Sequence, residues 1–97
     1  MNLEEEYLYF LQSFPELEFF LKNTQYLNAL KELLNGANTI GNLCKTYDLD
    51  PLILEQKFNS LRKKRFLDLI VLQHEKRYFL TPLAQRFFEI YFSLKGR

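Results

Sequence analysis

The sequence predicts a single, mainly helical α+β domain in which a series of helices is followed by a two-stranded hairpin and a last helix. Three observations predict it. The chain has 97 residues, 47% of them hydrophobic, enough for one core and too few for two. Apolar residues recur every three or four positions through most of the chain, as in amphipathic helices. After Arg65 this period stops, and two short runs rich in apolar and β-branched residues follow.

The first two helices are expected to meet at an elbow. Apolar side chains are spaced alternately by four and three residues, at Leu3, Tyr7, Phe10, Phe14, Leu17 and Leu21. A helix over residues 3–12 accounts for the first half of this pattern. In "SFPE", Ser13 is expected to cap a second helix over about 14–22, with Glu16 completing a capping box and Pro15 in the first turn.

The next two helices are bounded by polar caps. A helix follows Asn23 or Thr24 and ends at Asn35-Gly36, a left-handed stop. Its apolar face is Leu27, Leu30, Leu33 and Leu34. Thr39 is expected to cap a shorter helix that buries Ile40, Leu43, Cys44 and Tyr47.

Asp50-Pro51 starts the helix that carries most of the functional argument, over residues 51–64. Its inward stripe is Leu54, Phe58 and Leu61. The run "FLDLIVLQ" and the run "RYFLT" are expected to be strands joined by a turn at "HEK". Thr81-Pro82 then starts a last helix whose apolar residues cover more than one face: Leu83, Phe87, Phe88, Ile90, Tyr91, Phe92 and Leu94.

This order of elements resembles the winged helix-turn-helix over roughly residues 24–92, with the hairpin as the wing. Three sequence segments carry the resemblance: "TIGNLCKTYDLDP" at the start of the helix-turn-helix, "FNSLRKKRFLDL" leading into the wing and "RYFLTPLA" following it. The resemblance implies an acidic helical arm at 1–23, a winged helix-turn-helix at 24–81 and a C-terminal dimerisation helix at 82–97.

Two relatives of this fold fit the residues. Small prokaryotic winged-helix regulators are similar, and that likeness implies that the helix of residues 51–64 lies in the major groove of double-stranded DNA. The N-terminal dimerisation domain of S-adenosylmethionine-dependent O-methyltransferases is similar too, in "LDPLILEQKFNSLRKKRFLD" followed by "RYFLTPLA". That likeness implies a module that pairs subunits and touches no DNA.

The candidate DNA-binding residues lie on this helix and on the wing. The cations expected at phosphates are Lys57, Arg62, Lys63, Lys64, Arg65, Lys76 and Arg77. Gln56 and Asn59 are candidates for bidentate pairing with adenine, and Glu55 for accepting from cytosine. Leu52 and Ile53 fit either thymine methyl groups or a protein-docking patch, and Glu55 repels phosphate. Both interpretations therefore stay open.

Aromatic stripes at the two ends of the chain form the candidate dimer interface, which comprises Leu3, Tyr7, Phe10, Phe14, Phe87, Phe88, Tyr91 and Phe92. The terminal helices either cover one another within one chain or exchange between two copies. We favour a homodimer because 97 residues offer little else to cover the last helix.

Composition excludes several classes of function. Net charge is +1, but residues 22–97 hold all 13 basic residues against seven acids, a net of +6, while residues 1–21 hold five acids and no Lys or Arg. The lone Cys44 and His74 indicate neither a disulfide nor a metal site. We expect no cofactor, no catalytic activity, no membrane span and a cytoplasmic location. The leading hypothesis is a homodimeric winged-helix transcriptional regulator, and the alternative is a dimerisation or protein-interaction winged helix.

Overall fold

The computed structural model describes residues 2–96 as six α-helices, one 3₁₀ turn and one hairpin. The elements are α1 Leu3–Ser13, α2 Leu17–Lys22, α3 Thr24–Glu32, η1 Leu33–Asn35, α4 Ile40–Tyr47, α5 Pro51–Lys63, β1 Leu67–Leu72, β2 Glu75–Leu80 and α6 Pro82–Lys95. Residues 1 and 97, the outer ends of the first and last predicted segments, lie outside the described residues. The element order expected from the sequence is confirmed.

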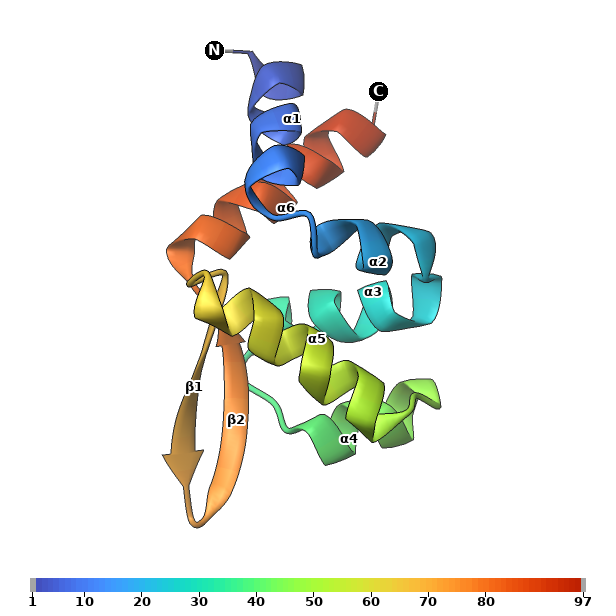
Figure 1. Ribbon diagram of the computed structural model, residues 1–97, viewed down its shortest axis with the longest axis vertical. Helices are drawn as coiled ribbons and strands as arrows, with labels where there is room; N and C mark the ends of the chain where they lie inside the picture. The colour runs from blue at the N-terminus through green and yellow to red at the C-terminus, as the bar shows by residue number, and fades with distance from the viewer. Residues whose placement is uncertain (1, 97) are drawn as a thin grey trace.

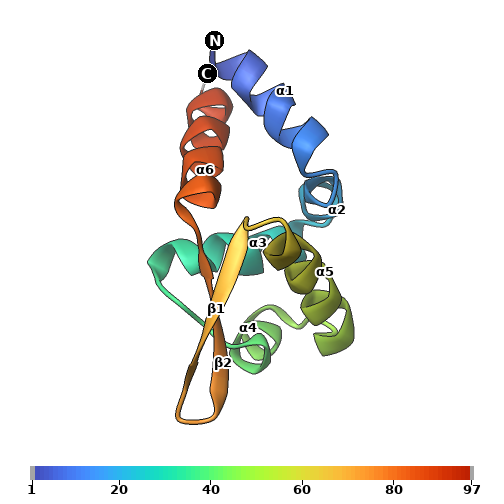
Figure 2. The ribbon, with the colours of Figure 1, turned by 60° about the vertical axis from the view of Figure 1, so that its left-hand side comes forward.

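The molecule is elongated, with principal extents of 42 × 23 × 22 Å. Figures 1 and 2 show α1 and α6 together at one end and the hairpin reaching away at the other end. Helices α2 to α5 fill the middle of the molecule, and α4 and α5 lie beside the hairpin. The hairpin therefore extends from the body on the side opposite to the chain termini.

The predicted cap at Ser13 is wrong. Ser13 is the last residue of α1, whose hydrogen-bond ladder continues to the Phe14 amide, which donates to the Phe10 carbonyl. The ladder persists because Phe10 and Phe14 bury the same face of α1. The second helix begins only at Leu17, with no side-chain cap. The capping box lies instead at the start of α1, between Asn2 and Glu5.

The predicted turn at "HEK" is also wrong, because only His74 of these three residues lies in the turn. The turn is Gln73-His74, and both residues have positive φ, +52° and +69°. Two left-handed residues make the turn type whose twist matches that of paired strands. Glu75 and Lys76 consequently pair with Leu72 and Val71 as part of the ladder.

A third short strand segment was not expected from the sequence. Asn38 and Tyr78 form an antiparallel bridge in which each amide donates to the other's carbonyl, at 3.0 and 2.8 Å. This bridge joins the linker before α4 to β2. It fixes the base of the hairpin against the helices, which positions the site described below.

The aromatic core links the two ends of the chain. Phe87 on α6 stacks on Tyr7 with ring centroids 5.9 Å apart, and it meets Phe10 and Phe66 edge-on at 5.5 and 5.8 Å. Burying each such side chain contributes roughly 1.5–3 kcal/mol. Helix α1 therefore covers α6 within a single chain.

Candidate nucleic-acid interface

Helix α5 is oriented by its cap and by its buried stripe. The Asp50 carboxylate accepts from the amides of Leu52 and Ile53, at 2.9 and 3.4 Å, and Pro51 is the first helical residue. As predicted, Leu54, Phe58 and Leu61 are fully buried. The opposite face of α5 is therefore presented outward, toward the hairpin and solvent.

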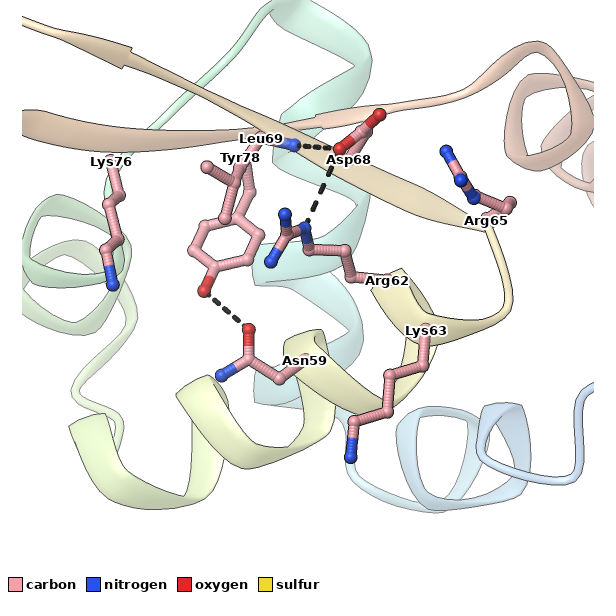
Figure 3. A pocket seen from close by; sticks show the side chains of 8 residues that line it. All are labelled: Asn59, Arg62, Lys63, Arg65, Asp68, Leu69, Lys76 and Tyr78. Atoms are coloured by element: carbon pink, nitrogen blue, oxygen red, sulfur yellow. Dashed lines mark hydrogen bonds and ion pairs between the residues drawn. The ribbon is translucent and has the colours of Figure 1, made fainter.

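A cleft of about 560 Å³ separates the C-terminal half of α5 from the hairpin (Figure 3). Four cations line it: Arg62 and Lys63 on α5, Arg65 in the following loop and Lys76 on β2. The remaining lining residues are Asn59, Asp68, Leu69 and Tyr78. The cleft therefore carries three more positive than negative side chains, and it suits an anionic ligand.

Arg65 belongs to the basic cluster expected at phosphates, and it lines the cleft. It adopts φ +64° directly after α5, where glycine is usual. The Phe66 amide donates to the Leu61 carbonyl and the Arg65 amide to the Arg62 carbonyl, both at 3.0 Å, which is the Schellman pattern of a helix end. The left-handed residue turns the chain into β1 and brings a guanidinium group to the cleft. The run "RKKR" gave the only signal for it.

Two side chains of α5 are held by the hairpin. The Tyr78 hydroxyl donates to Asn59 Oδ1 at 2.8 Å, and Arg62 Nε lies 3.6 Å from Asp68 Oδ1 (Figure 3). Burial of Tyr78, together with the nearby carboxylate of Glu55, raises the pKa of Tyr78. The phenol therefore stays protonated at neutral pH and acts as a donor. These contacts fix how the helix and the hairpin face each other.

Three predicted cations do not line the cleft. Lys57 places its ammonium over the Phe19 ring on α2, 4.5 Å from the centroid. Lys64 Nζ bonds Glu16 Oε1 at 3.2 Å and the Ser13 carbonyl at 3.3 Å.

Arg77 is the third. It alternates with Lys76 and Tyr78 along β2, so it lies on the other face of the hairpin, 3.9 Å from Glu75. Sequence alone does not distinguish these three cations from those in the cleft.

The start of α5 is apolar and exposed. Leu52 is 71% exposed and Ile53 37%. Glu55 and Gln56 are exposed beside them, and within residues 2–96 neither side chain makes a hydrogen bond or ion pair. Glu55 also lines a second hollow with His74 and Lys76 at the hairpin and with the start of α4. The predicted base-contacting residues therefore differ: the side chains of Glu55 and Gln56 are available, whereas Asn59 Oδ1 is already engaged by Tyr78.

Most of the predicted dimer residues are buried within one chain. Phe10, Phe14, Phe87, Phe88 and Tyr91 are buried, and Leu3 and Tyr7 are half-buried, because α1 packs on α6. The expectation that nothing else covers the last helix is therefore wrong for these residues. Phe92, at 45% exposure, remains available, as do Leu8 and Tyr9 on α1, which the sequence did not single out.

Other kinds of site find little support in residues 2–96. No helix there has both the length and the apolar character to cross a bilayer. No group of three or more His, Cys, Asp and Glu side chains in this range is arranged to hold a metal ion. Cys44 is buried, and burial raises the pKa of its thiol. The low nucleophilicity expected of such a thiol fits a core residue.

No protein-family model and no curated protein sequence matches this chain. Solved structures do. The DNA-binding domain of a possible ArsR-family transcriptional regulator from Mycobacterium bovis, described as a homodimeric winged helix-turn-helix, matches with a TM-score of 0.68 and 12% identity over 91% of this chain and 83% of that one. The chain has the winged helix-turn-helix fold. In it, α4 and α5 are the helix-turn-helix and β1–β2 is the wing.

Two further solved regulators agree. The transcriptional regulator HlyU from Vibrio vulnificus matches with a TM-score of 0.64 and 22% identity over 97% of this chain and 98% of that one. The transcriptional repressor BigR from Xylella fastidiosa matches with a TM-score of 0.63 and 16% identity over 98% and 95%. These likenesses extend beyond the helix-turn-helix to the terminal helices. They are likenesses to regulators and lend no support to the O-methyltransferase resemblance.

Proposed function

We propose that this chain is a homodimeric winged-helix DNA-binding protein that regulates transcription. The observation that carries the proposal is the cleft between α5 and the wing, where Arg62, Lys63, Arg65 and Lys76 converge. The Mycobacterium bovis domain of the same fold is described as DNA-binding and homodimeric, which supports the proposal.

The cleft suits the DNA backbone rather than a single small anion. Its cations come from the end of a helix, a loop and a strand, so they are spread along an open surface. Each phosphate contact steepens the fall of log affinity with log salt by about 0.9, so four contacts predict a slope of roughly −3.6. This electrostatic term supplies affinity without sequence information.

Sequence would be read by the exposed front of α5. Leu52 and Ile53 suit thymine methyl groups, Gln56 suits a bidentate contact with adenine, and Glu55 suits the cytosine amino group. With Pro51 and Asp50 fixing the start of the helix, these side chains project from a rigid frame. The apolar front is thus compatible with a major groove rich in A·T pairs.

The dimer would use the exposed apolar residues of the terminal helices, Leu8, Tyr9 and Phe92, with the buried aromatics as rigid support. A two-fold dimer of this fold reads two half-sites about 34 Å apart, or a multiple of that. A monomer at tens of micromolar by light scattering would remove this geometry.

The test is binding to mixed-sequence duplex DNA, by fluorescence anisotropy at about 50 and 200 mM salt. We expect micromolar or tighter binding at the lower salt and a steep loss at the higher. The variant Arg62→Glu, Lys63→Glu, Lys76→Glu should lose binding. A matched control with the same change in net charge, Lys22→Glu, Lys31→Glu, Lys95→Glu, leaves the cleft intact and should retain most of it.

A second candidate function is protein docking through the front of α5. The 71% exposure of Leu52 favours it, because an aliphatic side chain so exposed beside Ile53 and Glu55 also suits a protein partner. Absence of DNA binding even at low salt would leave this candidate, and Leu52→Asp would then be the variant to compare in partner capture.

A further inference from the structure

Asn59 and Tyr78 form a fixed pair across the cleft, from α5 to β2 (Figure 3). Tyr78 is only 1% exposed, its backbone is bridged to Asn38, and its ring meets Phe58 edge-on at 5.3 Å. The Tyr78 hydroxyl group is therefore held in one position by the packing of its ring and backbone. Asn59 is half-buried above it and lines the cleft one helical turn before Lys63, on the side toward the base-reading start of α5.

The chemistry of the pair decides which end of the Asn59 amide faces the cleft. Within residues 2–96 the Tyr78 hydroxyl has Asn59 as its one hydrogen-bond acceptor. If the amide were flipped, the buried hydroxyl hydrogen would lose its acceptor, and an unsatisfied buried donor is strongly disfavoured. Asn59 Oδ1 therefore faces Tyr78, and Nδ2, with its two hydrogens, faces the cleft.

We propose that Tyr78 is a specificity-determining positioning residue that makes Asn59 a hydrogen-bond donor to DNA, so that Asn59 selects guanine. The proposal rests on the proposed DNA-binding function. Bidentate recognition of adenine needs both ends of an asparagine amide, a donor for N7 and an acceptor for N6. Because Oδ1 points at Tyr78 while Nδ2 faces the cleft, the two ends of the amide do not both face one base edge, and that mode is disfavoured. The major-groove edge of guanine offers two acceptors, O6 and N7, and suits a donor alone.

This inference changes the role expected for Asn59. As a free side chain it resembles Gln56, which is exposed and able to offer both ends of its amide. Tied to Tyr78, it differs from Gln56 in chemistry although both are amides on one helix. The two residues should therefore prefer different bases.

The experiment selects binding sites from random duplexes with the wild type, Tyr78→Phe and Tyr47→Phe. The control is matched: Tyr47 also donates its hydroxyl to one side chain, Glu32 Oε1 at 2.5 Å, but neither residue lines the cleft. We expect a guanine in the wild-type site whose selection is lost when Asn59 is changed to alanine. Tyr78→Phe should shift that position toward adenine, while Tyr47→Phe should leave it unchanged.

The size of the shift is then measured by anisotropy on duplexes that differ at that one base pair. Freeing the amide should change the adenine-to-guanine affinity ratio by roughly tenfold, the order of discrimination that a bidentate contact supplies. The same preference in Tyr78→Phe as in the wild type would overturn the inference and leave DNA binding standing. A wild type that binds no DNA at low salt would instead overturn the proposed function and this inference with it. Thermal unfolding shows whether each variant is folded.

Discussion

Arg86 on α6 holds Glu6 on α1 through two hydrogen bonds, from Nη2 to Oε1 at 2.9 Å and from Nε to Oε2 at 3.2 Å. The pair joins residues 80 positions apart at the edge of the aromatic core. A two-point guanidinium–carboxylate contact fixes orientation as well as distance. It therefore sets how the N-terminal arm lies on the last helix.

The first prediction concerns the pH dependence of this pair. The hydrogen bond from Arg86 lowers the pKa of Glu6. A carboxyl group whose pKa is lower in the folded state stabilises the fold above its unfolded pKa, about 4.3, and that stabilisation is lost as the pH falls through the folded pKa. Glu6→Gln should therefore lower Tm at pH 7, and the gap to the wild type should close near pH 3.

The control for Glu6 is Glu55→Gln, because the Glu55 side chain makes no hydrogen bond or ion pair within residues 2–96. It should not reproduce the pH-dependent gap. A gap for Glu6→Gln that has the same size at both pH values would show that the ion pair does not couple α1 to α6.

A second prediction separates two adjacent lysines. Lys63 lines the cleft, whereas Lys64 is engaged by Glu16 and the Ser13 carbonyl. Lys63→Ala should reduce the log–log salt slope of DNA binding by about 0.9. Lys64→Ala should leave the slope unchanged and slightly lower Tm. Anisotropy titrations over a series of salt concentrations measure both, and equal slopes for the two variants would contradict the assignment.

The carboxylate in the cleft supplies a third prediction. Asp68 lies 3.6 Å from Arg62 and opposes the approach of phosphate. Asp68→Asn keeps an oxygen for the Leu69 amide but removes the charge, so DNA should bind more tightly, by roughly three- to tenfold at low salt. Asp48→Asn makes the same change of charge outside the cleft. If Asp48→Asn strengthens DNA binding as much as Asp68→Asn does, the gain comes from net charge alone.

Arg65 allows stability and binding to be separated. In Arg65→Gly, relief of the left-handed conformation is worth roughly 1–2 kcal/mol, partly offset by about 0.4–1 kcal/mol from the greater freedom of glycine in the unfolded chain. We expect the free energy of unfolding in urea to rise by up to about 1.6 kcal/mol. DNA affinity should fall because a cation leaves the cleft. A fall in the free energy of unfolding would instead show that the Arg65 side chain stabilises the fold.

The last prediction distinguishes core from interface on α6. Phe87 is fully buried within one chain, so Phe87→Ala should cost about 3–5 kcal/mol of unfolding free energy. Phe92 is 45% exposed, so Phe92→Glu should change monomer stability by only about 0.5 kcal/mol. It should nevertheless dissociate the proposed dimer, as measured by light scattering. A Phe92→Glu protein that remains dimeric would place the interface elsewhere.

Local chemistry made the helix boundaries of α4, α5 and α6 predictable. Thr39, Asp50 and Thr81 each cap the helix that follows, and their side chains accept from amides two or three residues ahead. Such contacts depend only on neighbouring residues, so the sequence carries them. The buried stripe Leu54, Phe58 and Leu61 follows in the same way from the helical period. The elbow at Ser13 was mispredicted. Ser13 is a good local cap, but the packing of Phe10 and Phe14 keeps it within α1.

The sequence by itself determined the order of the elements and the gathering of positive charge near the end of α5. Only the tertiary structure decided which cations face the cleft, because Lys63 and Lys64 are identical neighbours and Lys64 is held away by Glu16 and Ser13, far back along the chain. It also decided that Asn59 is a donor, through a hydroxyl 19 residues away. Helix caps and the helical spacing of apolar residues can be predicted from residues within one or two turns. The chemistry of a side chain at a site depends instead on the residues that the fold packs beside it.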